Sequence, residues 1–182
     1  MTLVIRAARE SDRDIVAGLW NGASAWLRQL GQDQWQYPVK LDGIEAAIEA
    51  GTCWLIEQPP YVTVATVTLD RFADPRLWLP EDKPEDGRYV HRLVVSRDAG
   101  IRHLGSAVLD WASMRTEAAG ARWLRLDAWT SNTQLHKYYL EHGFHLVRTV
   151  QAPGIPSGVL FERRARVTLG LGPAIRELTE DG

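Results

Sequence analysis

The sequence has a single cysteine, Cys53, and no apolar run near the roughly 20 residues of a membrane-spanning helix. One cysteine excludes a disulfide within the chain and is typical of proteins in a reducing cytoplasm. Cys53 lies between Thr52 and Trp54 in an apolar stretch, which favours a core residue over a nucleophile. Arg6 and Arg9 precede any hydrophobic block, so no signal peptide is predicted. We therefore expect a cytoplasmic protein.

An excess of charge of one sign is also missing. The chain has 21 Lys and Arg residues against 23 Asp and Glu residues, scattered along its length, for a net charge of -2. Nucleic acids and anionic membranes are bound by clustered basic residues. The sequence therefore favours neither as a partner.

The length and apolar content suffice for one well-filled core. The chain has 182 residues, 45% of them hydrophobic, with no internal repeat and no linker-like segment. We expect one domain over residues 1–165 and a C-terminal tail over residues 166–182, while a homodimer is left open.

Apolar periodicity and glycine stops predict a mixed α/β order. The expected strands are residues 3–8, 53–56, 61–69, 90–95, 122–129, 144–150 and 158–163, and the expected helices are residues 11–22, 23–31, 41–50, 107–119 and 133–141. The break in the first helical stretch is placed at Gly22. Residues 53–69 read as an antiparallel hairpin around Pro59-Pro60. The whole order predicts a mixed sheet with helices on both faces.

The most informative stretch runs from the strand at residues 90–95, through a loop containing Gly100 and Gly105, into the helix from Ala107. The first amides of a helix lack internal partners and point into the preceding loop, where the helix dipole favours negative charge. Such a junction is a common phosphate site. A dinucleotide-binding fold needs a third glycine, an acidic residue about twenty positions on and interleaved helices, so it is disfavoured.

Two motifs, in order and about one strand apart, carry a family resemblance. The first is the loop with Gly100, His103 and Gly105; the second is Asn132, Leu135, Tyr139, Gly143 and Phe144. On these residues the chain resembles bacterial, small-molecule-type members of the GCN5-related N-acetyltransferase (GNAT) superfamily. The segments Ile5-Arg6-Ala7-Ala8, Ser11-Asp12 and Asp33-Gln34-Trp35 are similar too. Gly100 and His103 depart from the family pattern, which usually has Gln or Arg and then Gly at these places.

The resemblance implies an acyl-CoA N-acyltransferase fold: a mixed, largely antiparallel sheet of about seven strands with helices on both faces, splayed between the fourth and fifth strands. It also implies acetyl-CoA as cosubstrate. The coenzyme residues expected from it are Leu93, Val94 and Val95 on the strand, Gly100, Ile101, Arg102, His103, Leu104, Gly105 and Ser106 in the loop, and Asn132 and Tyr139 beyond it. Asn132 has a second interpretation as a helix cap.

The resemblance also suggests an acid and a base for transfer to an amine. Tyr139 matches the family's proton donor to the coenzyme sulfur, and His91 resembles a histidine that works through water. A histidine hydrogen-bonded within the sheet is an equal reading of His91. Glu85 and Asp86 are rival carboxylates or plain loop charges. A main-chain amide near Val95 is the expected oxyanion donor.

Aromatic residues are the candidates for the acceptor site. Trp26, Trp35, Tyr37, Trp78 and Trp129 are expected to bind the acceptor by stacking or by cation-π attraction. No metal is expected, because His136, His142 and His145 do not have ligand spacing. The predicted activity is acetyl-CoA-dependent N-acetylation of a primary amine in a ternary complex, and the alternative is a catalytically silent acyl-CoA-binding module of the same fold.

Overall fold

The computed structural model describes residues 2–178, so the last four residues of the predicted tail lie outside the described residues. Its strands are β1 (Thr2–Ala7), β2 (Cys53–Gln58), β3 (Val62–Asp70), β4 (Gly87–Val95), β5 (Trp123–Ala128), β6 (His145–Thr149), β7 (Val159–Arg164) and β8 (Ala174–Glu177). Its α-helices are α1 (Arg13–Gln29), α2 (Leu41–Glu49), α3 (Leu104–Ala118) and α4 (Thr133–Glu141). No helix in this part of the chain is both long and apolar enough to cross a membrane.

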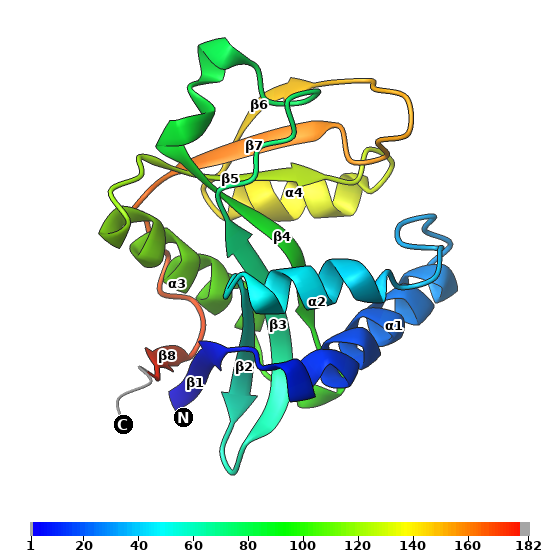
Figure 1. The fold of residues 1–182 in the computed structure, drawn as a ribbon, viewed down its shortest axis with the longest axis vertical. Coiled ribbons are helices and arrows are strands. Elements are labelled where there is room, and N and C mark those ends of the chain that lie inside the picture. The colour runs from blue at the N-terminus through cyan, green and yellow to red at the C-terminus, as the bar shows by residue number, and fades with distance from the viewer. Residues whose placement is uncertain (1, 179–182) are drawn as a thin grey trace. The chain divides into compact units, whose positions relative to one another are not determined.

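The strands form one mixed sheet in the order β6-β7-β5-β4-β3-β2-β1-β8, labelled in Figure 1. The β1·β2, β2·β3, β5·β7 and β6·β7 pairs are antiparallel, whereas β1·β8 and β4·β5 are parallel. The predicted mixed, largely antiparallel sheet is therefore confirmed, with eight strands in place of about seven. The β4·β5 ladder covers only Gly87–Tyr89 against Trp123–Arg125, which agrees with the expected splay after the start of β4.

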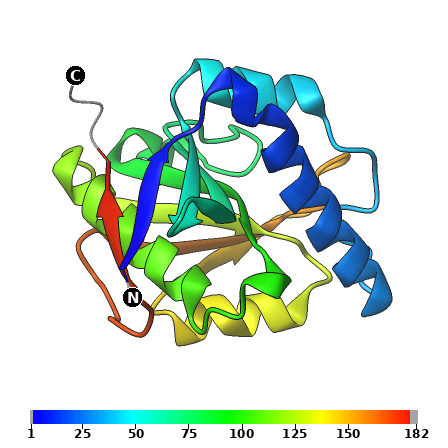
Figure 2. The ribbon, with the colours of Figure 1, turned by 90° about the horizontal axis from the view of Figure 1, so that it is seen from below.

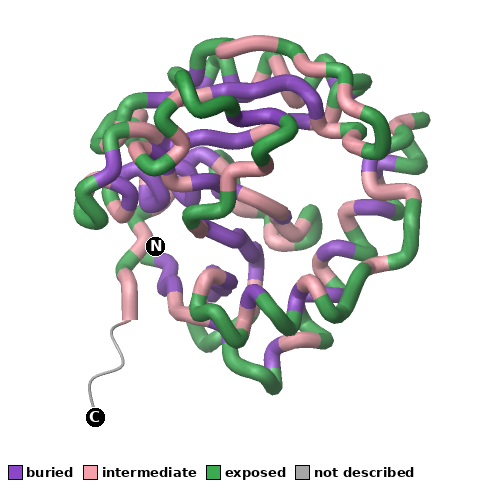
Figure 3. The backbone as a smooth tube through the Cα atoms, turned by 45° about the horizontal axis from the view of Figure 1, so that its top comes forward, coloured by how far each residue is buried: buried purple, intermediate pink, exposed green. Residues whose placement is uncertain are grey.

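The chain divides into two compact units, each described here by itself. Unit 1 holds the described residues up to Leu69, Arg92–Val108 and the described residues from Gly170. Unit 2 holds Asp70–His91 and Leu109–Leu169. Strand β4 and helix α3 run from one unit into the other. Buried residues, drawn purple in Figure 3, occur in the strands and in the helices of both units.

Unit 1 packs α1 and α2 on one face of the strands. Its core cluster joins Val16 and Trp20 of α1 to Ile44 of α2 and to Cys53 and Leu55 of β2. The thiol of Cys53 is buried, as the sequence predicted, and burial raises its pKa. Arg6 of β1 pairs with the carboxylates of Asp12 at 2.7 Å and Glu57 at 2.8 Å.

Helix α1 is continuous through Gly22, so the predicted break there is wrong. A glycine inside a helix costs only about 1 kcal/mol, and the buried face of α1, which includes Val16, Trp20 and Leu27, continues across it. The chain turns only at Gly31, which has a φ of 71°. The other glycine stops, Gly51 and Gly120, lie where predicted, with φ of 66° and 71°.

The tail contributes a strand that local pattern did not predict. Strand β8 pairs in parallel with β1, Leu3 lying opposite Ile175, and the two strands are side by side in Figure 2. Its four residues have little pattern of their own. The pairing brings together segments more than 170 positions apart, which no local signal encodes.

Unit 2 is built on β5, β7 and β6 with α4 and the start of β4. Arg163 is its most deeply buried charge, only 1% exposed. It donates to the carbonyls of His142 (2.8 Å) and Leu109 (2.7 Å) and to Ser113 Oγ (2.8 Å). Asp110 lies 3.5 Å away. One side chain near the end of β7 thus joins the end of α4 to α3.

Candidate functional site: a helix start and the strand before it

The loop between β4 and α3 has the backbone that a close-lying anion requires. Gly100 and His103 both adopt the left-handed region, with φ of 62° and 57°. The amide of Ala107 donates to the carbonyl of His103 at 3.0 Å, as the first bond of α3. The amides just before it have no acceptor within the helix, and the first turn of α3 holds no acidic residue. These residues fit a diphosphate.

His103, which stands where the family pattern has glycine, adopts a left-handed backbone conformation of the kind that glycine favours. Its side chain is exposed, and it has no hydrogen bond or ion pair within residues 2–178. The tail passes close behind the loop, since a Cβ at Gly172 would lie 2.5 Å from the carbonyl oxygen of His103. The hydroxyl of Ser106 is buried without a hydrogen-bond partner in the described residues, so a polar atom is left unsatisfied at this helix start.

Strand β4 leads into this loop and carries the other expected coenzyme residues. Val94 is buried, whereas Leu93 and Val95 are half-buried. The amide of Ser96 donates to Val64 of β3 at 2.8 Å, which anchors the end of the strand. Arg92 has a φ of 50°, so the regular alternation of faces assumed for this strand is interrupted there.

His91 has a carboxylate partner that sequence reasoning missed. Its Nε2 atom lies 3.1 Å from Oδ1 of Asp70, the last residue of β3, and both side chains are about one-fifth exposed. The same oxygen accepts the amide of Phe72 at 2.8 Å. Phe72 is 62% exposed, and its ring centre lies 6.4 Å from that of His91. The one local signal in the sequence was the spacing of Asp70 and Phe72, which is typical of a turn in which the aspartate side chain accepts the amide two residues later.

Tyr139 lies in an aromatic cluster of unit 2. Its ring is 8% exposed and packs edge-on against Phe144, with ring centres 5.6 Å apart. Burial raises the pKa of the Tyr139 phenol well above its usual value, and the neighbouring Tyr138 and Asp127 raise it further. The phenol is therefore fully protonated at neutral pH and available as a donor.

Asn132 caps α4, as one of its two interpretations predicted. Its side-chain oxygen accepts the amide of Leu135 at 3.1 Å. Glu85 lies exposed in a short 3₁₀ turn before β4. Asp86, beside it, lies 3.9 Å from Arg122 in a weak ion pair. The placements of Glu85 and Asp86 are those of solvated loop charges.

Three of the predicted acceptor residues gather in unit 1. Trp26 lies under the guanidinium of Arg97, 3.5 Å from the ring centre. Trp35 is half-buried and packs on Trp20 at 5.4 Å. Tyr37 is 41% exposed. Burial raises the pKa of the Tyr37 phenol, whereas the positive charge of Arg92 acts to lower it.

The other two predicted acceptor residues lie in unit 2, and the placement of Trp78 corrects its prediction. Trp78 is only 2% exposed, packs on Tyr89 at 5.4 Å and lies under the guanidinium of Arg125 at 4.9 Å. It is a core residue, because the proline-rich loop folds back over Leu160 of the sheet. Trp129 is half-buried, and its carbonyl lies 2.8 Å from Nε2 of His136.

The three histidines near α4 are engaged separately. His136 contacts the Trp129 carbonyl, His142 Nδ1 lies 2.7 Å from the Tyr138 carbonyl, and His145 lies 3.0 Å from Glu162. Each has its own partner on the protein.

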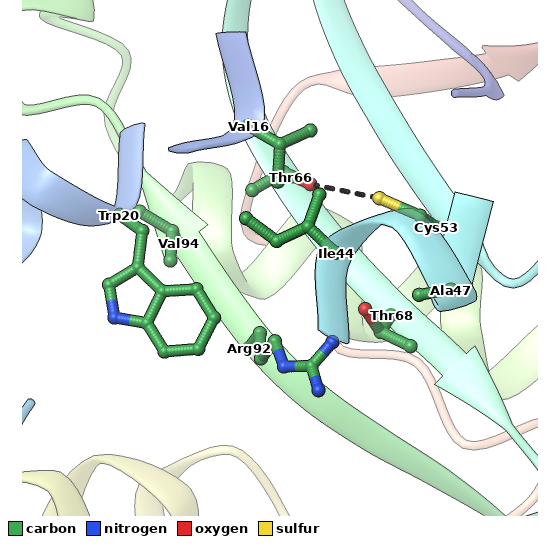
Figure 4. A pocket seen from close by; sticks show the side chains of 9 residues that line it. All are labelled: Val16, Trp20, Ile44, Ala47, Cys53, Thr66, Thr68, Arg92 and Val94. Atoms are coloured by element: carbon green, nitrogen blue, oxygen red, sulfur yellow. Dashed lines mark hydrogen bonds between the residues drawn. The ribbon is translucent and has the colours of Figure 1, made fainter. Parts of the chain in front are cut away.

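Unit 1 contains a small pocket between its two helices and the sheet (Figure 4). Its walls come from α1, α2, β2, β3 and β4, with the lining residues Val16, Trp20, Ile44, Ala47, Cys53, Thr66, Thr68, Arg92 and Val94. Arg92 is the charged residue of this lining. Sequence reasoning did not single out Arg92, since an arginine within a strand reads as a surface residue.

The comparisons with known proteins agree with this architecture. No family model matches the sequence. Over 141 residues the chain is 28% identical to the uncharacterized N-acetyltransferase YesJ of Bacillus subtilis (strain 168), covering 75% of this chain and 78% of YesJ. A GNAT-family acetyltransferase of Listeria monocytogenes superposes with a TM-score of 0.75 at 22% identity, covering 89% of this chain and 94% of that one.

A third match is a larger protein with its ligands bound. N-acetylglutamate synthase from Neisseria gonorrhoeae, complexed with coenzyme A and N-acetyl-glutamate, superposes with a TM-score of 0.63 at 17% identity. The match covers 90% of this chain but 35% of the synthase.

The sheet order, the helix start and these likenesses together define the fold: the chain has the acyl-CoA N-acyltransferase fold, and it is similar in sequence to an N-acetyltransferase. The resemblance to the GNAT superfamily seen in its two motifs is thereby confirmed.

Proposed function

We propose that the protein transfers an acetyl group from acetyl-CoA to a primary amine of a small molecule or peptide, by direct attack in a ternary complex. The observation that carries the proposal is the start of α3, where Gly100 and His103 hold a left-handed backbone ahead of amides without helical acceptors. A diphosphate-bearing ligand is the chemistry that this arrangement favours. The lone buried cysteine favours a cytoplasmic setting for the reaction.

Acetyl-CoA supplies the acetyl group as a thioester, whose carbonyl carbon gains the amine nitrogen and loses the sulfur. The amides of the loop before α3 would hold its diphosphate. Main-chain groups of Leu93 and Val95 on β4 would pair with its pantetheine arm, in the manner of an added strand. An amide near Val95 would stabilise the oxygen that becomes negative during attack.

An acid and a base are needed because an alkyl amine of pKa about 10 is unprotonated to only about one part in a thousand at pH 7. His91 takes a proton from the attacking amine, directly or through water. Asp70 holds the His91 ring by Nε2, so the proton acceptor is the other ring nitrogen. Tyr139 gives its proton to the departing sulfur; its phenol carries that proton at neutral pH, and its raised pKa makes it a weaker acid than an ordinary tyrosine.

Two measurements test the proposal in sequence. Calorimetry with CoA and with acetyl-CoA measures binding, and release of free thiol then measures turnover with a panel of amines. Binding of neither coenzyme would contradict the proposal. Binding without turnover on any amine would instead indicate a silent acyl-CoA-binding module.

Adjacent tyrosines give a matched pair of variants. Tyr139→Phe should lower kcat at least tenfold, the low end for loss of a general acid, with little change in KM for acetyl-CoA. Tyr138→Phe should stay within about twofold, because the Tyr138 ring is stacked on His142 at 3.9 Å and packs much the same without its hydroxyl. Equal effects of the two changes would remove Tyr139 from the role of donor.

The histidine and its partner are tested in the same assay. His91→Gln should lower kcat by about a hundredfold, as for loss of a general base. Asp70→Asn should lower kcat by a smaller factor at unchanged KM, since Asp70 acts by positioning the ring. Asp74→Asn is the control, because Asp74 pairs with Arg76 in the following loop at 2.6 Å. Activity of Asp70→Asn equal to that of the control would exclude the positioning role.

A further inference from the structure

Arg92 lies at the interruption in β4, just before the strand residues proposed to hold the acyl donor. Its φ of 50° is unusual for a residue other than glycine and sets it apart from the regular strand. The guanidinium extends from this point towards the start of α2, beside Ile44 and Trp20 in Figure 4. A charged group is therefore held at one place on the proposed donor strand.

The charge of Arg92 has no carboxylate partner among residues 2–178. Its Nη1 atom donates to the Gly43 carbonyl at 3.1 Å, and its guanidinium carbon lies 5.6 Å from the ring centre of Trp20. By contrast, other arginines of low exposure do pair with carboxylates: Arg6 with Asp12, Arg125 with Glu162, Arg148 with Asp82 and Arg163 with Asp110. A guanidinium has five N–H donors, so Arg92 keeps donors for an anion.

Cations of the protein already lie over the aromatic rings of this region. Arg92 lies over Trp20, Arg97 over Trp26 at 3.5 Å, and Lys40 over Tyr37 at 5.8 Å. A ring face covered by a protein cation does not attract a second one, and the three positive charges repel a polycationic ligand. Of the two uses considered for these aromatic residues, stacking on the acceptor is favoured over capture of an ammonium group.

The pocket at Arg92 admits only the end of a ligand. Its volume is about 10 Å³, room for one water-sized group. Thr68 lines the same pocket, and the hydroxyl of Thr66 is already committed to the Trp54 carbonyl at 3.0 Å. This space takes a single oxygen atom of an anionic group, and the fork of the guanidinium suits a carboxylate in particular.

We propose that Arg92 binds the carboxylate of the acceptor, so that the substrates of this enzyme are amines that also carry a carboxylate, of the amino-acid type. The inference rests on the proposed function and names the substrate class of the same site. A nearby guanidinium also lowers the pKa of an amine and so increases its unprotonated fraction. Polyamines and simple alkylamines are then poor substrates.

The test compares matched acceptors that differ only at the carboxylate. The probes are L-phenylalanine with L-phenylalaninamide and phenethylamine, L-tryptophan with tryptamine, and L-leucine with isopentylamine. Thiol release from acetyl-CoA gives kcat/KM for each with the wild type, Arg92→Gln, Arg92→Lys and Arg88→Gln. Arg88 is the matched control, because it lies on the same strand, is half-buried and donates to the carbonyl of Gly87 at 2.9 Å.

In the wild type, at least one amino acid should exceed its matched amide or amine by about tenfold or more in kcat/KM. Arg92→Gln should remove that preference by raising KM for the amino acid, so that the amino acid and its matched amide or amine differ by less than about twofold in kcat/KM. Arg92→Lys should restore part of it, and Arg88→Gln should keep it whole. A wild-type preference for the uncharged or decarboxylated acceptors would overturn the inference while the proposed function stands.

A binding arm separates failure of the inference from failure of the proposed function. If no probe is acetylated although CoA binds, the three amino acids are titrated into the CoA-loaded wild type and the CoA-loaded Arg92→Gln by calorimetry. Heat with the wild type and none with Arg92→Gln supports the carboxylate subsite without turnover. No heat with either protein, or equal heat with both, overturns it. Thermal melts of each variant show whether it is folded.

Discussion

Replacing His103 by glycine should make the protein more stable. His103 lies in the loop before α3 with a φ of 57°, and its exposed side chain makes no hydrogen bond or ion pair within residues 2–178. A residue with a Cβ in this conformation costs roughly 1–2 kcal/mol relative to one without it. The substitution removes this cost and takes away no polar contact.

The gain is reduced by the unfolded chain. Glycine has more conformational freedom there, which lowers stability by about 0.4–1 kcal/mol. The net effect expected for His103→Gly is therefore a gain of about 0.5–1 kcal/mol. In a chain of this length 1 kcal/mol corresponds to about 2–4 °C in melting temperature, so the midpoint should rise by about 1–4 °C.

The control is the neighbouring residue. Arg102 is also exposed and has no positive φ. Arg102→Gly has the same cost in the unfolded chain and relieves no strain, so its midpoint should fall by about 1–3 °C. His103→Val should also lower the midpoint, since a β-branched residue is disfavoured in the left-handed region. Thermal melts of the four proteins, with urea titrations, measure all of these changes.

Opposite signs at two adjacent positions are what the backbone conformation requires. A fall in midpoint for both glycine variants would show that His103 is unstrained or that its ring contributes contacts, and the reasoning would fail. Calorimetry with CoA extends the test. Because glycine favours the backbone conformation that the loop already has, His103→Gly should bind CoA at least as tightly as the wild type does.

Two further predictions concern buried charges. Arg163→Ala should lower the free energy of unfolding by about 3–5 kcal/mol, because two carbonyls and a carboxylate lose their donor. Replacing the exposed Arg164 by alanine should lower it by at most about 1 kcal/mol. Urea titrations that find equal losses would contradict the role of Arg163. Arg6 holds the pKa of Asp12 below its usual value, so this carboxylate stabilises the fold above the unfolded pKa near 3.8 and the contribution is lost as pH falls through the lower folded value. Asp12→Asn should therefore be less stable than the wild type at pH 7, with the difference narrowing steadily as pH falls below about 4, while Asp14→Asn should match the wild type throughout; a gap as wide at pH 3 as at pH 7 would refute the assignment.

The sequence by itself determined the order of elements up to β7, apart from the break expected at Gly22, and the approximate position of the helix start. These depend on local physics: apolar periodicity, left-handed glycines such as Gly51 and Gly120, and a capping side chain at Asn132. The order of strands and helices then allowed a mixed, largely antiparallel sheet, and the two motifs carried the family resemblance. The prediction was wrong at Gly22, where two local signals oppose each other. The buried apolar face of α1 continues across this position and outweighs the tendency of one glycine to end the helix.

The tertiary structure alone decided which side chains meet. Asp70 reaches His91 across 21 positions, Arg92 reaches the Gly43 carbonyl across 49, and β8 pairs with β1 from the other end of the chain. It also buried Trp78, which the sequence had assigned to the acceptor site. A periodic pattern reports which face of an element is apolar, whereas the partner of that face depends on packing among distant segments. The substrate-determining contacts proposed here belong to this second kind.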